Sequence, residues 1–176
     1  DTNQEVLQVF RDGFDHLCFI VRADQFFVRQ SDGSFTGDLI DEAAHRVANR
    51  LRDQMQRVIS QTPDAFFVIS FKGYEQVGGW DALGIKQSYF ARSFEASEEV
   101  QRAFLRLWGI FSSELRQISQ NNLAFNLMNE PEYHTFSSNI RRGRDAWCSL
   151  AEQFIDFIRT FNANRLIIVE AVDKGS

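Results

Sequence analysis

The stretch LAFNLMNEP, residues 123–131, joins an apolar run to a polar turn. Leu123 to Met128 has the length and apolar content of a strand that is buried on both faces. Asn129, Glu130 and Pro131 follow it directly. A carboxylate that comes just past a buried parallel strand lies at the mouth of the sheet and not on a solvated flank. The stretch therefore predicts a buried strand with a carboxylate at its end.

Three more apolar runs of strand length occur in the chain, and amphipathic helices separate them. The runs are His16 to Val21, Ala65 to Phe71 and Arg165 to Ala171. Apolar residues recur at spacings of three and four in the predicted helices, which cover residues 4–11, 40–58, 97–118 and 147–161. Strands that are apolar on both faces and alternate with such helices are typical of a parallel sheet covered by helices. The sequence therefore predicts an α/β fold of parallel βα units of the TIM-barrel type.

The predicted loops are long after the strands and short before them. The long ones are residues 24–39, 73–96 and 129–139. In parallel α/β folds, ligands bind at the carboxyl ends of the strands. We therefore expect the functional site at that edge of the sheet.

Composition sets limits on function. The 176 residues are enough for one domain, which we expect to span residues 1–176. With 19 Lys and Arg against 24 Asp and Glu, the net charge is -5, and such a chain is a poor binder of nucleic acid. No apolar run approaches the roughly 20 residues that span a bilayer. The three histidines lack metal-ligand spacing, and we expect Cys18 and Cys148 to be two buried thiols and not a disulfide.

Glu130 is the strongest candidate for chemistry. A carboxylate buried at the mouth of the sheet is suited to general-acid catalysis, and Asn129 beside it can form a hydrogen bond with a substrate hydroxyl group. The alternative is a helix-capping Asn-Glu-Pro turn without chemistry. The residue pattern alone leaves both interpretations open.

Asn129-Glu130-Pro131 after a strand resembles the Asn-Glu-Pro signature of glycoside hydrolase family 5, the cellulase family of retaining (β/α)8-barrel glycosidases. Four other segments resemble parts of the same barrel, namely Gly13 to Leu17, Phe66 to Glu75, Phe104 to Trp108 and Asn164 to Val169. In that order they resemble the entry into the second strand, the third strand with its loop, the helix before the fourth strand, and the fifth strand. The resemblance runs from about Glu5 to the end and implies roughly half a barrel, strands 2 to 5.

The resemblance also implies an activity. It implies a glycoside hydrolase that acts on β-linked glucan or a related polysaccharide, with Glu130 as general acid/base and Asn129 in contact with the sugar 2-hydroxyl group. It implies no metal ion and no organic cofactor. We expect a secreted or periplasmic location, because polysaccharide substrates lie outside the cell.

The sequence departs from the family pattern in several places. Cys18 stands where the second strand carries an arginine, and Lys72 stands where the third strand ends in a histidine. The family's first strand has no counterpart, and its nucleophilic glutamate belongs to the seventh strand, which the resemblance does not reach. These departures favour a non-catalytic carbohydrate-binding or scaffold protein with the same fold. A third interpretation is a fragment of a longer enzyme.

A retaining mechanism needs a second carboxylate about 5 Å from the first. The best candidates are Glu170 and Glu75, ahead of Asp24 and Asp173. Each of them has the alternative of being a solvated loop charge. Lys72 is either a functional amine that holds Glu130 ionised or a lysine that extends from a strand end into solvent.

Aromatic residues in the long loops are candidates for stacking on sugar rings. Trp80 and Tyr133 are the best of these, ahead of Tyr74 and Tyr89. The alternative is that these rings only hold the loops against the barrel rim.

Four strands cannot close an eight-stranded barrel, so two strand edges remain to be covered. The 18 phenylalanines add to this need, because stripes such as Phe104/Phe111 and Phe154/Phe161 are expected to require a complete sheet for their burial. We expect association through the open barrel edges, most simply as a homodimer. The alternative is a small open sheet whose outer helices fold over its edges.

Overall fold

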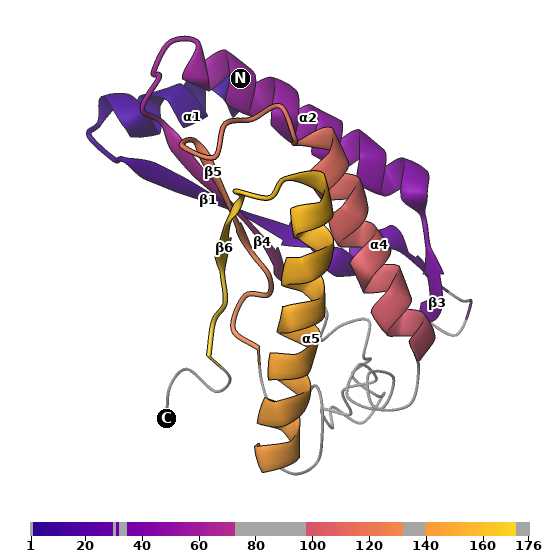
Figure 1. Ribbon diagram of the computed structural model, residues 1–176. Coiled ribbons are helices and arrows are strands. Elements are labelled where there is room, and N and C mark those ends of the chain that lie inside the picture. Colours follow the sequence, from indigo (N-terminus) through magenta and orange to yellow (C-terminus); the bar gives the residue numbers. More distant parts are fainter. Residues whose placement is uncertain (1, 30, 32–34, 73–97, 132–139, 172–176) are drawn as a thin grey trace, which may run out of the picture.

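The computed structural model describes residues 2–29, 31, 35–72, 98–131 and 140–171. Its elements, in chain order, are α1 (Thr2–Arg11), β1 (His16–Arg22), the short 3-10 helix η1 (Ala23–Phe26), β2 (Phe27–Arg29), β3 (Phe35–Leu39), α2 (Asp41–Ile59), β4 (Phe66–Lys72), α4 (Glu98–Glu114), β5 (Leu123–Asn126), α5 (Ile140–Phe161) and β6 (Leu166–Ile168) (Figure 1). In the described part of the chain, β1, β4, β5 and β6 are parallel and form one sheet in that order. The predicted α/β fold of parallel βα units is confirmed.

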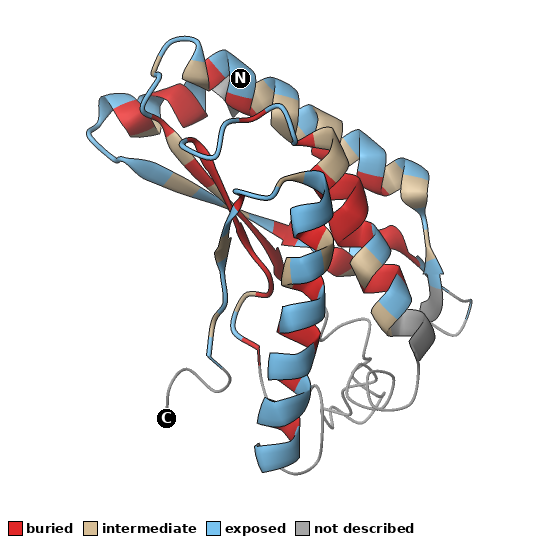
Figure 2. Ribbon diagram, in the orientation of Figure 1, coloured by how far each residue is buried: buried red, intermediate tan, exposed pale blue. Residues whose placement is uncertain are grey.

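The helices form one layer on one face of the sheet. α2 contacts both α1 and α4, and α4 contacts α5. On β4, the fully buried apolar residues are Phe67, Ile69 and Phe71, and they alternate with residues that face the other way, of which Ser70 is also buried. Phe67 packs against Phe10 of α1, and Phe71 packs against Trp108 of α4. Figure 2 shows the buried residues gathered in the middle strands and on the helix sides turned toward them.

We call the other side of the sheet the open face. It carries Cys18 and Ile20 of β1 and the residues paired with them in register, which are Val68 and Ser70 of β4, Ala124 and Asn126 of β5, and Leu166 and Ile168 of β6. On the two outer strands these residues are uncovered: Ile20 is 55% exposed, Leu166 is 51% exposed and Ile168 is 36% exposed. Helices therefore cover one side of the sheet, whereas the outer strands are exposed on its open face.

Phe71 lies at the centre of an aromatic core between the sheet and α4. Its ring centroid is 4.5 Å from that of Trp108, 4.9 Å from that of Phe111 and 5.9 Å from that of Phe104. Phe104, Phe111 and Phe154 are fully buried, whereas Phe161 is 39% exposed. The expectation that these helix stripes would lack a cover is wrong for all but Phe161. Because β4 and β5 are central strands, they already provide α4 with a surface on which to bury its phenylalanines.

Residues 24–39, predicted to be a loop, contain η1 and the antiparallel pair of β2 and β3. Phe27 pairs with Leu39, and the amide of Ile40 donates a hydrogen bond to the carbonyl oxygen of Phe26 at 2.6 Å. Phe26 and Phe27 are buried, and α4 packs against β3. A three-residue strand is too short to show an alternating pattern, and so the prediction of a loop is wrong here.

Cys18 and Cys148 are both free, as predicted, but both are exposed and not buried. Cys18 lies on the open face, where no described element covers β1. Cys148 lies on α5, next to buried Trp147 in sequence, and is exposed. No helix in the described part of the chain is long and apolar enough to cross a membrane.

Arg165, just before β6, ties the end of α4 to the start of β5. Its side chain is 3% exposed and lies 5.2 Å from the centroid of the Phe125 ring. The guanidinium group donates hydrogen bonds at 2.8–3.3 Å to the carbonyl oxygens of Leu115, Ile118, Ser119 and Leu123. Burial lowers the pKa of Arg165 to about 10, so the group is still charged at neutral pH.

Candidate active site

Glu130 lies just past the carboxyl end of β5, as the sequence predicts. The amide of Asn129 donates a hydrogen bond to the carbonyl oxygen of Phe71 at 2.9 Å, which ties this turn to the end of β4. Glu130 has a φ of 49°, in the left-handed region that residues other than glycine rarely adopt. Such a conformation persists only where surrounding contacts impose it, and it is found preferentially at functional sites.

The side chain of Glu130 is 47% exposed, whereas the sequence predicts burial. The physical reason is the open face. In a closed barrel, the mouth of the sheet is ringed by strands on all sides, and here the described sheet has four.

Glu170 is the described carboxylate that the structure brings to Glu130. It follows β6, the neighbour of β5, and one of its oxygens, Oε2, accepts a hydrogen bond from the backbone amide of Glu130 at 2.7 Å. Its other oxygen, Oε1, accepts a hydrogen bond from the side-chain amide of Asn126. Asn126 is 6% exposed. Glu170 is therefore part of the Glu130 turn and not a solvated loop charge.

Trp147 of α5 completes this arrangement. It is 2% exposed, and its indole Nε1 donates a hydrogen bond to the carbonyl oxygen of Glu170 at 3.0 Å. Neither Trp147 nor Asn126 is predicted as a site residue from the sequence. Asn126 could have been recognised, because it is the polar residue inside an otherwise apolar strand. Trp147 could not, because its place in the apolar stripe of a helix is that of an ordinary core residue.

Lys72 ends β4 and approaches Glu130 from the other side. Its Nζ lies 3.9 Å from Oε2 of Glu130, and the two side chains are 43% and 47% exposed. An ion pair this long and this exposed contributes at most about 0–1 kcal/mol to stability. The contact nevertheless places a cation directly beside the candidate acid/base.

Arg22 ends β1 and is paired in register with Lys72. Its guanidinium group binds Asp24 with two hydrogen bonds, Nε to Oδ1 at 3.0 Å and Nη2 to Oδ2 at 2.9 Å. Asp24 is therefore held by a bidentate pair, which makes it a poor second carboxylate. Along the carboxyl edge of the sheet, β1 and β4 contribute cations and β5 and β6 are followed by carboxylates.

The Cys18 thiol is close enough to this edge of the sheet for the charge of Glu170 to act on it. Partial burial raises the pKa of the Cys18 thiol, and the negative charge of Glu170 raises it further. The thiol at the position of the family's arginine is therefore neutral at physiological pH and does not replace that cation.

Several predicted site residues lie outside the described residues, namely Trp80, Tyr133, Glu75, Tyr74, Tyr89 and Asp173. The described residues contain no group of three or more His, Cys, Asp or Glu side chains that could hold a metal ion.

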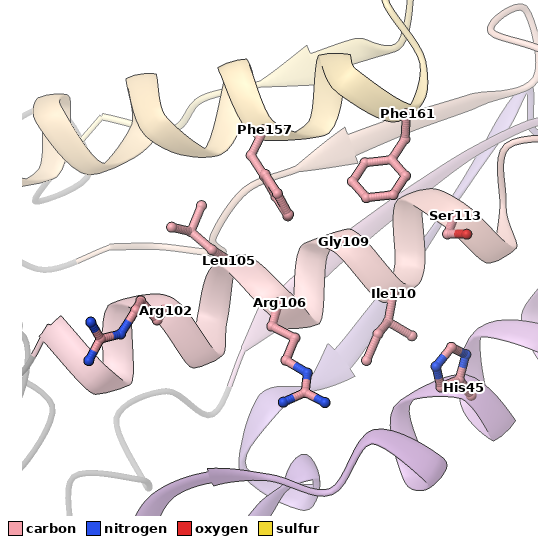
Figure 3. A pocket seen from close by; sticks show the side chains of 9 residues that line it. All are labelled: His45, Arg102, Leu105, Arg106, Gly109, Ile110, Ser113, Phe157 and Phe161. Atoms are coloured by element: carbon pink, nitrogen blue, oxygen red, sulfur yellow. The ribbon is translucent and has the colours of Figure 1, made fainter.

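A pocket of about 440 Å³ lies on the helical side of the molecule, away from the strand ends (Figure 3). Its floor is α4, with Phe157 and Phe161 of α5 on one side and His45 of α2 on the other. Gly109 of α4 lets the helices approach closely, because a Cβ atom there would lie 2.8 Å from Cε1 of Phe157. None of the lining residues belongs to a strand, and so the pocket is separate from the candidate active site.

Comparison with known proteins points to one family. The sequence profile of the family "Cellulase (glycosyl hydrolase family 5)" matches residues 13–175. No curated protein matches the chain at a significant level.

Solved structures resemble the chain over nearly its whole length. A crystal structure of a glycoside hydrolase is 18% identical with a TM-score of 0.66, covering 98% of this chain and 47% of its own. Thermotoga maritima Cel5A in complex with cellobiose is 18% identical with a TM-score of 0.59, covering 98% and 45%. A tri-modular endo-beta-1,4-glucanase from Bacillus licheniformis is 16% identical with a TM-score of 0.65, covering 96% and 28%. The chain thus spans half or less of the length of these structures, and at these identities the likeness concerns the fold.

Proposed function

Since this chain belongs to glycosyl hydrolase family 5, we propose that it hydrolyses β-linked glucans or related polysaccharides and that Glu130 is its general acid/base. One observation carries the proposal. The Asn129-Glu130 turn follows a central parallel strand, at the edge of the sheet where the family fold binds its substrate, and hydrogen bonds from two neighbouring strand ends hold it there.

In this proposal, Glu130 protonates the departing glycosidic oxygen and then takes a proton from the attacking water. Asn129 binds the hydroxyl group next to the reacting carbon. Lys72 binds substrate beside Glu130, and Trp80 and Tyr133 stack on sugar rings. No cofactor takes part. We also propose that the protein works outside the cytoplasm, where polymeric glucans are found.

A retaining mechanism also needs a nucleophilic carboxylate besides Glu130. Of the carboxylates that the structure describes, Glu170 is the one that contacts the Glu130 turn, and both of its oxygens already accept hydrogen bonds. We propose that the nucleophilic carboxylate comes from a strand beyond these four, supplied by the same polypeptide or by another.

Hydrolysis of a soluble β-glucan by the parent protein and by Glu130→Gln tests the proposal. We expect Glu130→Gln to lower kcat by about 10²- to 10⁴-fold, the usual contribution of a general acid/base. Glu152→Gln, an exposed position on α5, is the matched control and should leave kcat unchanged. Equal rates for the parent and Glu130→Gln would contradict the assignment.

A non-catalytic carbohydrate-binding role is the second candidate. Cys18 and Lys72 favour it, because they stand where the family pattern has an arginine and a histidine. Calorimetric titration with cello-oligosaccharides, combined with product analysis, separates the two functions. A binding protein would give saturable heat without new reducing ends.

A further inference from the structure

Glu170 has a contact pattern that the proposed mechanism leaves unexplained. It comes two residues after the end of β6, and its two carboxylate oxygens reach different elements. Oε2 accepts a hydrogen bond from the backbone amide of Glu130 at 2.7 Å. Oε1 accepts one from the side-chain amide of Asn126, the last residue of β5. A hydrogen bond to an ionised acceptor is about twice as strong as one between neutral groups.

The amide that Glu170 binds belongs to a residue in a disfavoured conformation. Glu130 has a φ of 49°, and the polar groups of such a turn must be satisfied from outside it because no ladder continues through it. The backbone amide of Glu130 donates its hydrogen bond to Glu170, and the backbone amide of Asn129 donates to the carbonyl oxygen of Phe71 at 2.9 Å. The two contacts hold the turn from both neighbouring strands.

Glu170 is itself held in place. Indole Nε1 of Trp147 donates to its carbonyl oxygen at 3.0 Å, and the amide of Leu127 donates to the carbonyl oxygen of Ile168 at 3.1 Å. Trp147 is 2% exposed and belongs to α5, the longest described helix. A chain of contacts therefore runs from the helical layer through Glu170 to the backbone of Glu130.

We infer that Glu170 is a positioning residue that fixes the left-handed backbone of Glu130 and so aims its side chain, and that it is not the nucleophile. The catalytic consequence rests on the proposed function, whereas the positioning itself does not. A misplacement of about 1 Å in a catalytic group can cost on the order of 10²-fold in rate, so this contact is sufficient to matter for activity.

Two substitutions separate positioning from nucleophilic attack. In Glu170→Gln, the new side-chain oxygen can still accept the Glu130 amide. If the Asn126 amide rotates, the new NH₂ group can donate a hydrogen bond to its Oδ1. That oxygen is buried and has no hydrogen-bond partner among the described residues. Glu170→Ala removes both contacts. A nucleophile would fail in both variants, because attack requires the carboxylate.

With a soluble β-glucan, we expect Glu170→Gln to retain kcat within about fivefold and Glu170→Ala to lose on the order of 10²-fold. With an aryl β-cellobioside whose leaving group needs no protonation, we expect the kcat/KM of Glu170→Ala to fall less than about fivefold. This ratio reports the formation of the glycosyl-enzyme, which needs no acid with this leaving group, and it excludes the later step in which Glu130 acts as base. Equal losses for both variants, or for both substrates, would overturn the inference. Glu152→Gln again serves as the control.

Hydrogen exchange at the Glu130 amide, followed by NMR, tests the positioning without any activity. We expect exchange about tenfold or more faster in Glu170→Ala and nearly unchanged in Glu170→Gln, because removal of the acceptor frees the turn to open locally. An unchanged rate in Glu170→Ala overturns the inference. If Glu130→Gln proves harmless to hydrolysis while the amide behaves as expected, the proposed function fails and the positioning role stands.

Discussion

Arg165 is a buried cation held mainly by neutral groups. Backbone carbonyl oxygens of four residues accept its hydrogen bonds, and the ring of Phe125 lies beside its guanidinium group. The carbonyl groups of Leu115 and Ile118 lie in the turns that follow α4, beyond the regular hydrogen bonds of the helix. That of Leu115 also accepts the backbone amide of Ile118 at 3.1 Å. Arg165 thus takes the place of a helix cap.

We predict that Arg165→Met lowers the free energy of unfolding by about 2–4 kcal/mol. Methionine fills much of the same volume but removes the guanidinium donor from four carbonyl oxygens, of which those of Leu115 and Ser119 keep a backbone amide as donor. A buried carbonyl oxygen left without any donor costs about 1–3 kcal/mol. Urea unfolding followed by circular dichroism measures the change. Arg159→Met, at an exposed position on α5, is the control and should change stability by less than about 0.5 kcal/mol. Similar values for the two variants would contradict the capping role.

At this scale the sequence predicts individual site residues better than their contacts. Glu130 is identifiable because the Asn-Glu-Pro turn follows an apolar run, and Glu170 and Lys72 are identifiable because each follows or ends a strand. The hydrogen bonds that join Glu130, Glu170 and Asn126 were not predictable in this way. They depend on β6 lying next to β5 and on the left-handed backbone conformation of Glu130. Local composition does not determine either of these.

At the scale of elements, α4 and α5 meet at Gly109. A Cβ atom on Gly109 would lie 2.8 Å from Cε1 and 3.2 Å from Cζ of Phe157, both closer than an ordinary van der Waals contact. Figure 3 shows the Phe157 ring pointing toward this part of α4. The glycine weakens α4 locally but allows the ring to pack against it.

We predict that Gly109→Ala destabilises the protein by about 1–2 kcal/mol, because overpacking outweighs the gain in helix propensity. In a Phe157→Ala background, the same substitution should stabilise by about 0.5–1 kcal/mol, because only the propensity of alanine remains. Chemical denaturation of the four proteins of this double-mutant cycle gives the coupling energy. An equal effect of Gly109→Ala in both backgrounds would show that the ring does not set the helix distance.

Long elements were predictable and short ones were not. Helices α2 and α5 and strand β4 repeat apolar residues often enough to reveal their period. β2 has three residues and no visible period, and its one buried residue, Phe27, packs against Phe104 of α4. Arg165 starts a predicted apolar run but lies outside β6, because its side chain turns back to the carbonyl groups near α4.

At the scale of the whole molecule, the open face and the strand edges are the unfinished parts. Ile20, Leu166 and Ile168 are exposed there, and β1 and β6 are each paired on one side only in the described sheet. Burial of such side chains contributes about 1.5–3 kcal/mol each, and unpaired strand edges recruit further strands. We propose that the isolated chain associates through these surfaces, most simply as a homodimer.

The prediction is a mass above the single-chain 20.4 kDa in light scattering coupled to size exclusion. Ile168→Glu on the open face should restore the single-chain mass, whereas Phe161→Glu on α5 should not, although the two parent side chains are similarly exposed, at 36% and 39%. Association should also slow alkylation of Cys18, with exposed Cys148 as the reference in the same chain. A sharp peak at the single-chain mass that is unchanged on tenfold dilution would contradict the proposal.

The order of the sheet, β1-β4-β5-β6, is also the order in which the ribosome makes these strands. Each new strand therefore meets a partner that has already emerged, and the helix made between them can close over the pair at once. Assembly can proceed in one direction along the chain, as domains folding during synthesis tend to do. At every stage the strand made last is the growing edge. β6 occupies that position here, which makes it the template on which a further parallel strand would be laid.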